Sequence, residues 1–330
     1  MRFMKRFIQP FVFCTLLLFI TIASVSRVWG ADKELREPAE PSFSADGAQI
    51  VYIEHVTPPG KILYTTGEIW TIKTDGSAAQ RLTQDFNDGH PHFSPNGKQI
   101  VFVRDLYLWL INADGSNLRR VSDTKGAFSH GAVFSNDGQS LFFVRPAETK
   151  FTAEALAKEP LIALAGGDVL VQYDLQTQKE RVLLDESYNV QQAIVNPNND
   201  NVIFVLCTAL DNNGKPQFLG EKVIAVVHLQ GAPELRTVFA PDKEHTLSQV
   251  CISQTNNAVM ASTKGKYGDD VFLIENGALQ KVDGLGNLGD ISRDGKIIVG
   301  TGLDDKIQWQ IVFYNIDAKT LTPLKKVATN

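Results

Sequence analysis

The stretch His90–Ser122, HPHFSPNGKQIVFVRDLYLWLINADGSNLRRVS, contains one complete unit of the fold. It holds two apolar runs, Ile100–Val103 and Tyr107–Ile111, and two turn signals, Asn96-Gly97 and Asp114-Gly115. Asn-Gly and Asp-Gly favour tight hairpins because both positions tolerate positive φ. The stretch therefore predicts four antiparallel strands: one before the Asn-Gly turn, the two apolar runs, and one after the Asp-Gly turn.

The unit recurs along the chain. We call the apolar residue that opens each FSPNG-like segment its anchor, and the anchors are Phe43, Phe93, Phe134, Val195, Ile252 and Ile291. Two apolar runs and a closing strand follow each anchor, which gives six units of about 40 to 60 residues, as in propeller blades. One four-stranded sheet cannot bury both of its faces alone. The sequence thus predicts an all-β fold over residues 31–330, a six-bladed β-propeller of four-stranded antiparallel blades.

The N-terminal 30 residues have the pattern of a secretory signal peptide. Arg2, Lys5 and Arg6 precede an apolar run at 11–23, and small residues stand before Ala31. An uncleaved membrane anchor is the alternative, although the run is short for a span of about 20 residues. We expect a periplasmic or secreted protein, associated with a membrane only through a partner or an uncleaved signal.

Charge excludes one class of partner. Removal of residues 1–30 deletes four basic and no acidic residues, so the formal net charge changes from −5 to −9. Nucleic-acid binding depends on clustered Lys and Arg, and we therefore expect no nucleic-acid partner.

Two cysteines lie in the expected propeller. Cys207 falls in the second strand of unit four and Cys251 in the first strand of unit five. An oxidising compartment would permit a disulfide between adjacent blades, whereas buried cysteine also packs as a small hydrophobe. The sequence leaves both possibilities open.

The loops divide the propeller into two faces. Asp-Gly and Asn-Gly hairpins fall on one face, and the longer insertions, 54–67, 145–167 and 208–221, fall on the other together with the entries to the first strands. Residues 152–158 could form a short helix. Because scaffolds place binding on such loops, we expect the site at the channel mouth on the insertion face.

Polar residues gather at the expected entries to the first strands. The candidate ligand-binding residues are His90, His92, His130, Gln191, His245, Gln249 and Asp290, and Gln192 lies beside Gln191 at a nearby position. They either fix the strand entries by hydrogen-bonding the neighbouring blade, contact a polar ligand or protein, or bind a metal, for which Asn87, His90 and His92 have a suitable spacing. His130 precedes its anchor by four residues and His90 by three, an offset that turns the side chains to opposite faces. We therefore expect no metal and no cofactor.

The sequence contains no catalytic motif in the structural context that the motif requires, and we predict no catalytic residue. Gly284, Gly286 and Gly289 spell G-x-G-x-x-G, but a dinucleotide site needs a strand before the motif and a helix after it. The chain has no G-x-S-x-G elbow, no H-E-x-x-H motif and no P-loop.

The repeats resemble those of the TolB-type six-bladed propellers. The resemblance rests on EPSFSADGAQIVY at 40–52 and HPHFSPNGKQIVF at 90–102, followed by IWTIKTDG or LWLINADG and by RLT or RVS. It covers nearly all of residues 31–330 and decays in units four and five. TolB-type proteins carry a further α/β domain before the propeller, whereas here residues 31–40 lead directly into the first unit. Oligogalacturonate lyases resemble the same family and hold manganese with His and Gln at inner-strand entries. Prolyl-oligopeptidase-type peptidases also use such propellers, but the chain ends at Asn330 without a hydrolase domain.

These observations favour a monomeric, non-catalytic binding module for a protein or cell-envelope component. The alternative is a glycan-active enzyme similar to the oligogalacturonate lyases, with its site at the channel mouth. The absence of paired carboxylates and of a nucleophile–base set favours the first interpretation.

Overall fold

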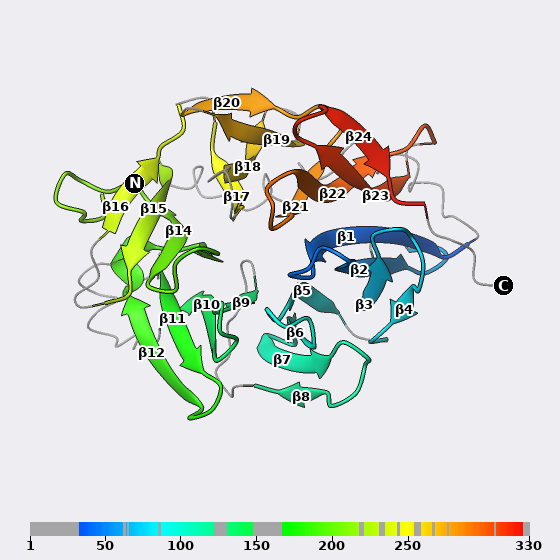
Figure 1. The fold of residues 1–330 in the computed structure, drawn as a ribbon, viewed down its shortest axis with the longest axis horizontal. Coiled ribbons are helices and arrows are strands. Elements are labelled where there is room, and N and C mark those ends of the chain that lie inside the picture. The colour runs from blue at the N-terminus through cyan, green and yellow to red at the C-terminus, as the bar shows by residue number, and fades with distance from the viewer. Residues whose placement is uncertain are drawn as a thin grey trace, which may run out of the picture.

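The computed structural model describes residues 33–61, 64, 66–84, 87–121, 131–147, 167–217, 221–230, 235–242, 245–253, 259–265, 268–275, 277–306 and 308–325. Within this part of the chain the strands form six four-stranded antiparallel sheets arranged in a ring (Figure 1). Each sheet uses four consecutive strands. The predicted six-bladed propeller is confirmed.

The first three blades hold these strands, in chain order: β1 (Leu35–Phe43), β2 (Gln49–Thr57), β3 (Thr66–Lys73) and β4 (Gln80–Arg81); β5 (Asp88–Phe93), β6 (Gln99–Arg104), β7 (Tyr107–Asn112) and β8 (Arg119–Arg120); β9 (Ala132–Phe134), β10 (Ser140–Pro146), β11 (Asp168–Asp174) and β12 (Lys179–Leu184). A short 3₁₀ turn, η3 (Glu186–Tyr188), leads to blade four.

The other three blades hold β13 (Gln192–Val195), β14 (Val202–Thr208), β15 (Lys222–His228) and β16 (Leu235–Phe239); β17 (Leu247–Ile252), β18 (Val259–Gly265), β19 (Gly268–Glu275) and β20 (Ala278–Lys281); β21 (Asn287–Ile291), β22 (Ile297–Leu303), β23 (Trp309–Asn315) and β24 (Thr320–Pro323). The first strand of each blade lies nearest the central channel (Figure 1).

The repeated turn after each anchor has a specific hydrogen-bond pattern. In blade one, Asp46 Oδ1 accepts from Ser44 Oγ at 2.7 Å and from Ala48 N at 3.0 Å, while Gly47 has φ of 71°. These bonds hold the pKa of Asp46 below its usual value. Asn96, Asp137 and Asp294 accept equivalent bonds in blades two, three and six. The local sequence therefore fixes these hairpins.

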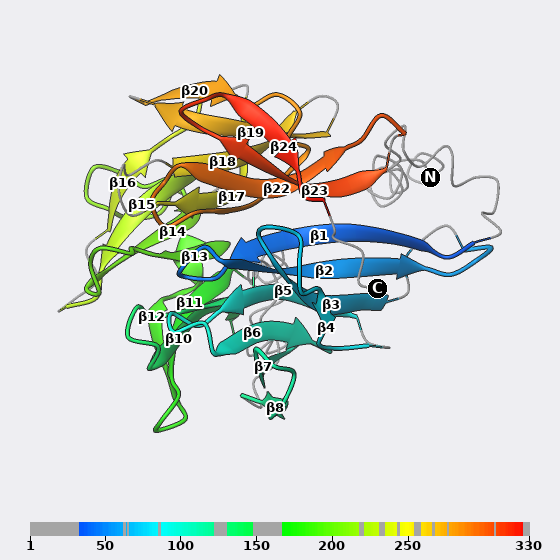
Figure 2. The same cartoon turned by 45° about the vertical axis from the view of Figure 1, so that its right-hand side comes forward.

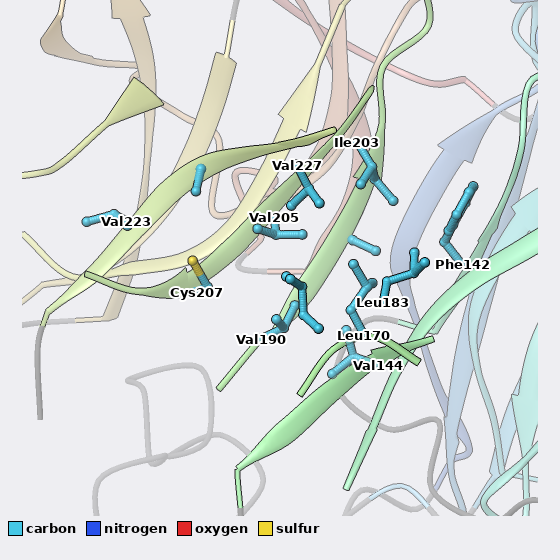
Figure 3. Close-up of a cluster of buried hydrophobic side chains, with 13 residues drawn as sticks. Phe142, Val144, Leu170, Leu183, Val190, Ile203, Val205, Cys207, Val223 and Val227 are labelled. Atoms are coloured by element: carbon cyan, nitrogen blue, oxygen red, sulfur yellow. The ribbon is translucent and has the colours of Figure 1, made fainter. Parts of the chain in front are cut away.

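The core lies between blades. Figure 3 shows one such layer, in which Phe142 and Leu170 of blade three pack against Ile203, Val205 and Val223 of blade four. All five side chains are buried. Because every sheet buries both faces only against neighbours, the blades depend on a complete ring.

Among the described residues the ring closes without a shared strand. In that part of the chain blade one consists of β1–β4 and blade six of β21–β24, and the two lie side by side (Figures 1 and 2). Tyr52 and Ile72 of blade one pack with Val299 and Ile311 of blade six. The first and last blades are therefore held together by side-chain contacts, not by a common sheet.

The anchor phenylalanines occupy equivalent positions but differ in burial. Each pairs with the first apolar residue of the second strand, as in the pair Phe93–Ile100. Phe134 is 6% exposed, whereas Phe43 and Phe93 are only half-buried. The equivalence of the three anchors in the repeat favours equal burial, and this is wrong for Phe43 and Phe93, although all three residues line the cavity.

Both cysteines are free thiols. Cys207 packs among the buried residues between blades three and four, and Cys251 packs between blades five and six. Burial raises the pKa of Cys207 to about 12. Of the two possibilities left by the sequence, the structure contains the buried thiols and not the disulfide.

Two predictions lie outside the described residues: the signal peptide at 1–30 and the short helix at 152–158. In the part of the chain that is described, no helix has the length and apolar character needed to cross a membrane.

Candidate binding site in the central channel

A cavity of about 400 Å³ occupies the centre of the ring. All six blades line it with their first strands, through residues 40–43, 90–93, 133–134, 192–195, 249–252 and 289–291. Its volume falls within the range of small-molecule and peptide-side-chain pockets.

The cavity lies in the half of the channel that the sequence did not favour. Beyond the anchors its lining continues to Ala45, Pro95, Asn136, Pro197 and Arg293, which belong to the turns between the first and second strands. These turns form the Asp-Gly hairpin face. The described cavity is thus on the hairpin side of the channel, whereas a site on the insertion face remains a prediction, because much of that face lies outside the described residues.

Glu40 of blade one reaches the first strand of blade two. Its Oε2 accepts from the backbone N of His90 at 2.6 Å and lies 3.2 Å from His90 Nδ1. Burial opposes ionisation of the carboxyl, but the hydrogen bonds and charge of His90 outweigh it and hold the pKa of Glu40 at about 2. Glu40 therefore remains a carboxylate that joins two blades.

Glu40 and His90 share an unusual backbone. Both stand three residues before their anchors, and both have positive φ, 50° and 54°. Gly131 stands at the same position in blade three with φ of 66°, and a Cβ there would lie 2.8 Å from His90 O. The third blade must have glycine at this point because the second blade passes so close.

Asp290 of blade six joins the last blade to the first. Its Oδ2 accepts from Ser42 Oγ at 2.9 Å and from Phe43 N at 3.0 Å. Ser42 Oγ also lies 3.2 Å from His92 Nδ1. Since the serine hydroxyl donates its one proton to Asp290, it accepts from His92, which places the His92 proton on Nδ1. One chain of hydrogen bonds thus crosses blades six, one and two.

Two glutamines make the same kind of link farther round the ring. Gln192 of blade four donates to Val250 O and accepts from Val250 N of blade five, both at 2.8 Å. Gln249 of blade five donates to Gly289 O of blade six at 3.3 Å. Each side chain bonds the channel-facing backbone edge of the next blade.

The structure brings together four of the seven predicted site residues. His90, His92, Gln249 and Asp290 line the cavity. Gln191 and His245 do not: Gln191 bonds to Lys222, and His245 lies 2.6 Å from Asp242 Oδ1. Both precede the cavity-lining stretch of their own first strand, and their role in binding at the channel mouth remains a prediction. His130 is outside the described residues.

The sequence analysis missed Glu40 and Ser42. Both lie one or three residues before an anchor, as do His90, His92, Gln192, Gln249 and Asp290. A search for polar residues at these two positions would have found them and would have rejected Gln191. Asn87 also lies away from the cavity and forms a bridge to Gly67.

A metal site lacks the necessary ligands among the described residues. No three His, Cys, Asp or Glu side chains come together there in a way that could hold an ion. The two channel histidines have Nδ1 beside an acceptor, which is typical of metal-binding histidines, but structural or catalytic zinc sites need three or four protein ligands.

The sequence matches no protein-family model. An uncharacterised protein of Agrobacterium fabrum is 29% identical over 120 residues, and the match covers 32% of this chain and 39% of that protein. The matched segment is therefore well under half of the curated relative.

Solved structures resemble most of the chain. TolB from Acinetobacter baumannii has a TM-score of 0.60 at 12% identity, over 91% of this chain and 81% of its own. The fold is a TolB-like propeller. Oligogalacturonate lyase from Vibrio parahaemolyticus has a TM-score of 0.56 at 15% identity, over the same two shares. An oligogalacturonate lyase in complex with manganese has a TM-score of 0.55 at 14% identity, over 88% of this chain and 77% of its own.

Proposed function

We propose that this TolB-like propeller is a non-catalytic binding module of the periplasm or the extracellular space, which takes a protein or cell-envelope component at the central cavity. The proposal rests on the hydrogen bonds that the polar side chains of the channel make. Glu40, Gln192 and Asp290 are each bonded to the backbone of a neighbouring blade. A carboxylate fixed in this way is poorly placed to transfer a proton to a substrate.

The walls of the cavity support binding. The half-buried rings of Phe43 and Phe93, together with Phe134, offer apolar surface beside a few fixed polar groups. Ligand pockets commonly combine an apolar lining with a small number of oriented polar groups.

Site-specific photo-crosslinking tests the proposal. A photo-crosslinking residue in place of Ala45, at the turn end of the cavity, is compared with one in place of Leu118, which is 43% exposed on a turn. We expect a discrete adduct from position 45 in an envelope extract and none from position 118. Equal, diffuse adducts from both positions would reject a binding site in the channel.

A second candidate is a glycan-active lyase, favoured by the paired histidines in the cavity and by the similarity to the two lyase structures. Its test is the ultraviolet absorbance of an unsaturated product when the protein is incubated with oligogalacturonate and manganese. Turnover that His90→Ala and His92→Ala abolish would establish this candidate and reject the non-catalytic one.

A further inference from the structure

Polar side chains bond the inner edges of the first strands in blades one, two, five and six. Phe43 N bonds to Asp290, His90 N to Glu40, Val250 N and O to Gln192, and Gly289 O to Gln249. An exposed strand edge carries unpaired N–H and C=O groups. In these four blades the polar side chains hydrogen-bond backbone N–H or C=O groups that face the channel.

Blade three differs from the blades that supply these bonds. One and three residues before its anchor it has Val133 and Gly131, whereas every other blade has a polar residue in at least one of the two positions. The strand itself, β9, is Ala-Val-Phe. No side chain of β9 can therefore hydrogen-bond the inner edge of β13 in blade four; Val133 packs against the buried cluster that includes Ala193, and Asn136, beyond β9, donates to Asn196 O just after β13.

Two edges lack such a bond among the described residues: that of β9, at Ala132 and Phe134, and that of β13, at Ala193 and Val195; only at β13 do both residues line the cavity. Ala193 stands two residues before its anchor, as Val250 does, and Val195 is an anchor, as Phe43 is. By this equivalence the Ala193 amide and carbonyl and the Val195 amide face the channel. Both residues line the cavity, and among the described residues no hydrogen bond from a side chain reaches either of them.

We propose that the inner edge of β13 is the ligand-bonding edge of the cavity and that it takes an extended peptide segment of a partner protein by strand addition. Groups two residues apart on a strand repeat at about 7 Å, and another extended backbone presents its own donors and acceptors at the same repeat. Main-chain bonds then supply affinity, and pockets for alternate side chains supply specificity.

The cavity walls fit this ligand class. Phe134 of the adjacent blade three and Phe93 of blade two also line the cavity and supply aromatic surface for side chains of a bound peptide. The inference rests on the proposed binding function and adds to it the ligand class and the bonding edge.

Hydrogen exchange at single-amide resolution tests the edge without any ligand. We expect the amides of Ala193 and Val195 to exchange about 100-fold faster than those of Phe43 and Val250, because the latter are hydrogen-bonded. Equal protection of all four amides would overturn the proposal. This measurement uses the wild-type protein and does not depend on the folding of a variant.

Substitution at Val133 tests the ligand class. Val133→Asp copies the relation of Asp290 to Phe43 and should occupy the Val195 amide, whereas Val133→Ala removes the side chain and adds no acceptor. The probe is a capped pentapeptide of alternating valine and threonine, with a matched peptide N-methylated at its two central amides. We expect binding to the wild type and to Val133→Ala, and a loss of about tenfold or more with Val133→Asp and with the methylated peptide.

Three outcomes separate this inference from the proposed function. If neither backbone methylation nor Val133→Asp lowers the affinity for the peptide, strand addition is overturned. It is also overturned if no binding is measurable at about 1 mM peptide. If the crosslinked adduct at position 45 persists in Val133→Asp, the module still binds its partner but not through β13. If the wild type gives no adduct, the proposed function itself fails.

Discussion

Asp290 and Phe43, 247 residues apart in the chain, are joined by a 3.0 Å hydrogen bond from the Phe43 amide to the Asp290 carboxylate. The same carboxylate oxygen accepts from Ser42 Oγ at 2.9 Å. Because the first and last blades share no strand, these bonds and the apolar layer behind them close the ring. Asp290, one position before its anchor, therefore accepts hydrogen bonds across a seam that also has an apolar layer.

Asp290→Ala should destabilise the protein by about 1 to 3 kcal/mol, because it leaves the Phe43 amide and the Ser42 hydroxyl without their acceptor. Asp305→Ala is the matched control, since Asp305 is an exposed acid of the same blade. Urea titration of both variants measures the difference. A loss no larger than that of the control would show that the carboxylate does not hold the seam.

Gly289→Ala should destabilise the same seam by overpacking, by about 1 to 3 kcal/mol or more. A Cβ at Gly289 would lie 2.7 Å from Pro41 Cγ and 2.8 Å from Val299 O, so the two blades would have to separate. Gly89→Ala is the control, because a Cβ there meets no atom within 4 Å. Thermal melts that rank the two variants equally would contradict the close approach of blades six and one.

Phe134→Ala should cost about 3 to 5 kcal/mol, the usual range for a buried aromatic side chain. Phe93→Ala should cost less, because Phe93 is half-buried and faces the cavity. Denaturant titration of the two variants checks the order. The reverse order would mean that Phe93, and not Phe134, is the more deeply buried of the two anchors.

Glu40 should make stability depend on acid pH. Its folded pKa, about 2, lies below its ordinary value of 4.5, so its contribution is present above about pH 4.5 and is lost as the pH falls toward 2. Glu40→Gln removes the charge, and the stability difference from wild type should shrink over this interval. Chemical denaturation at several pH values tests it. If the difference in unfolding free energy between wild type and Glu40→Gln stays constant from pH 5 to pH 2, the pairing of the carboxylate with His90 is not its cause.

The thiols of Cys207 and Cys251 should resist modification in the native protein. Both are buried, and burial raises the pKa of each, with nearby Asp290 adding to the effect at Cys251. A thiol reagent at pH 8, applied to a Cys14→Ser variant, should label neither site until denaturant unfolds the ring. Both sites should then react together, because the blades unfold as one unit. Failure to label two thiols after unfolding without reductant would indicate a disulfide.

The sequence by itself determined the blades. The recurrence of an apolar anchor, an Asx-Gly turn and two apolar runs is local information, and the turn bonds that follow, such as Ser44 to Asp46, join residues two positions apart. The positions of the anchors and the second-strand pairs, such as Phe93 with Ile100, follow from that pattern directly.

Only the tertiary structure decided which side chains meet and where the channel is hollow. Glu40 and His90 are 50 residues apart, and Ser42 and Asp290 are 248 apart, so their pairing depends on how whole blades are placed in the ring. The sequence pointed to both Gln191 and Gln192 and could not separate them, because adjacent residues on a strand face opposite sides and only the packed blades reveal which side is which.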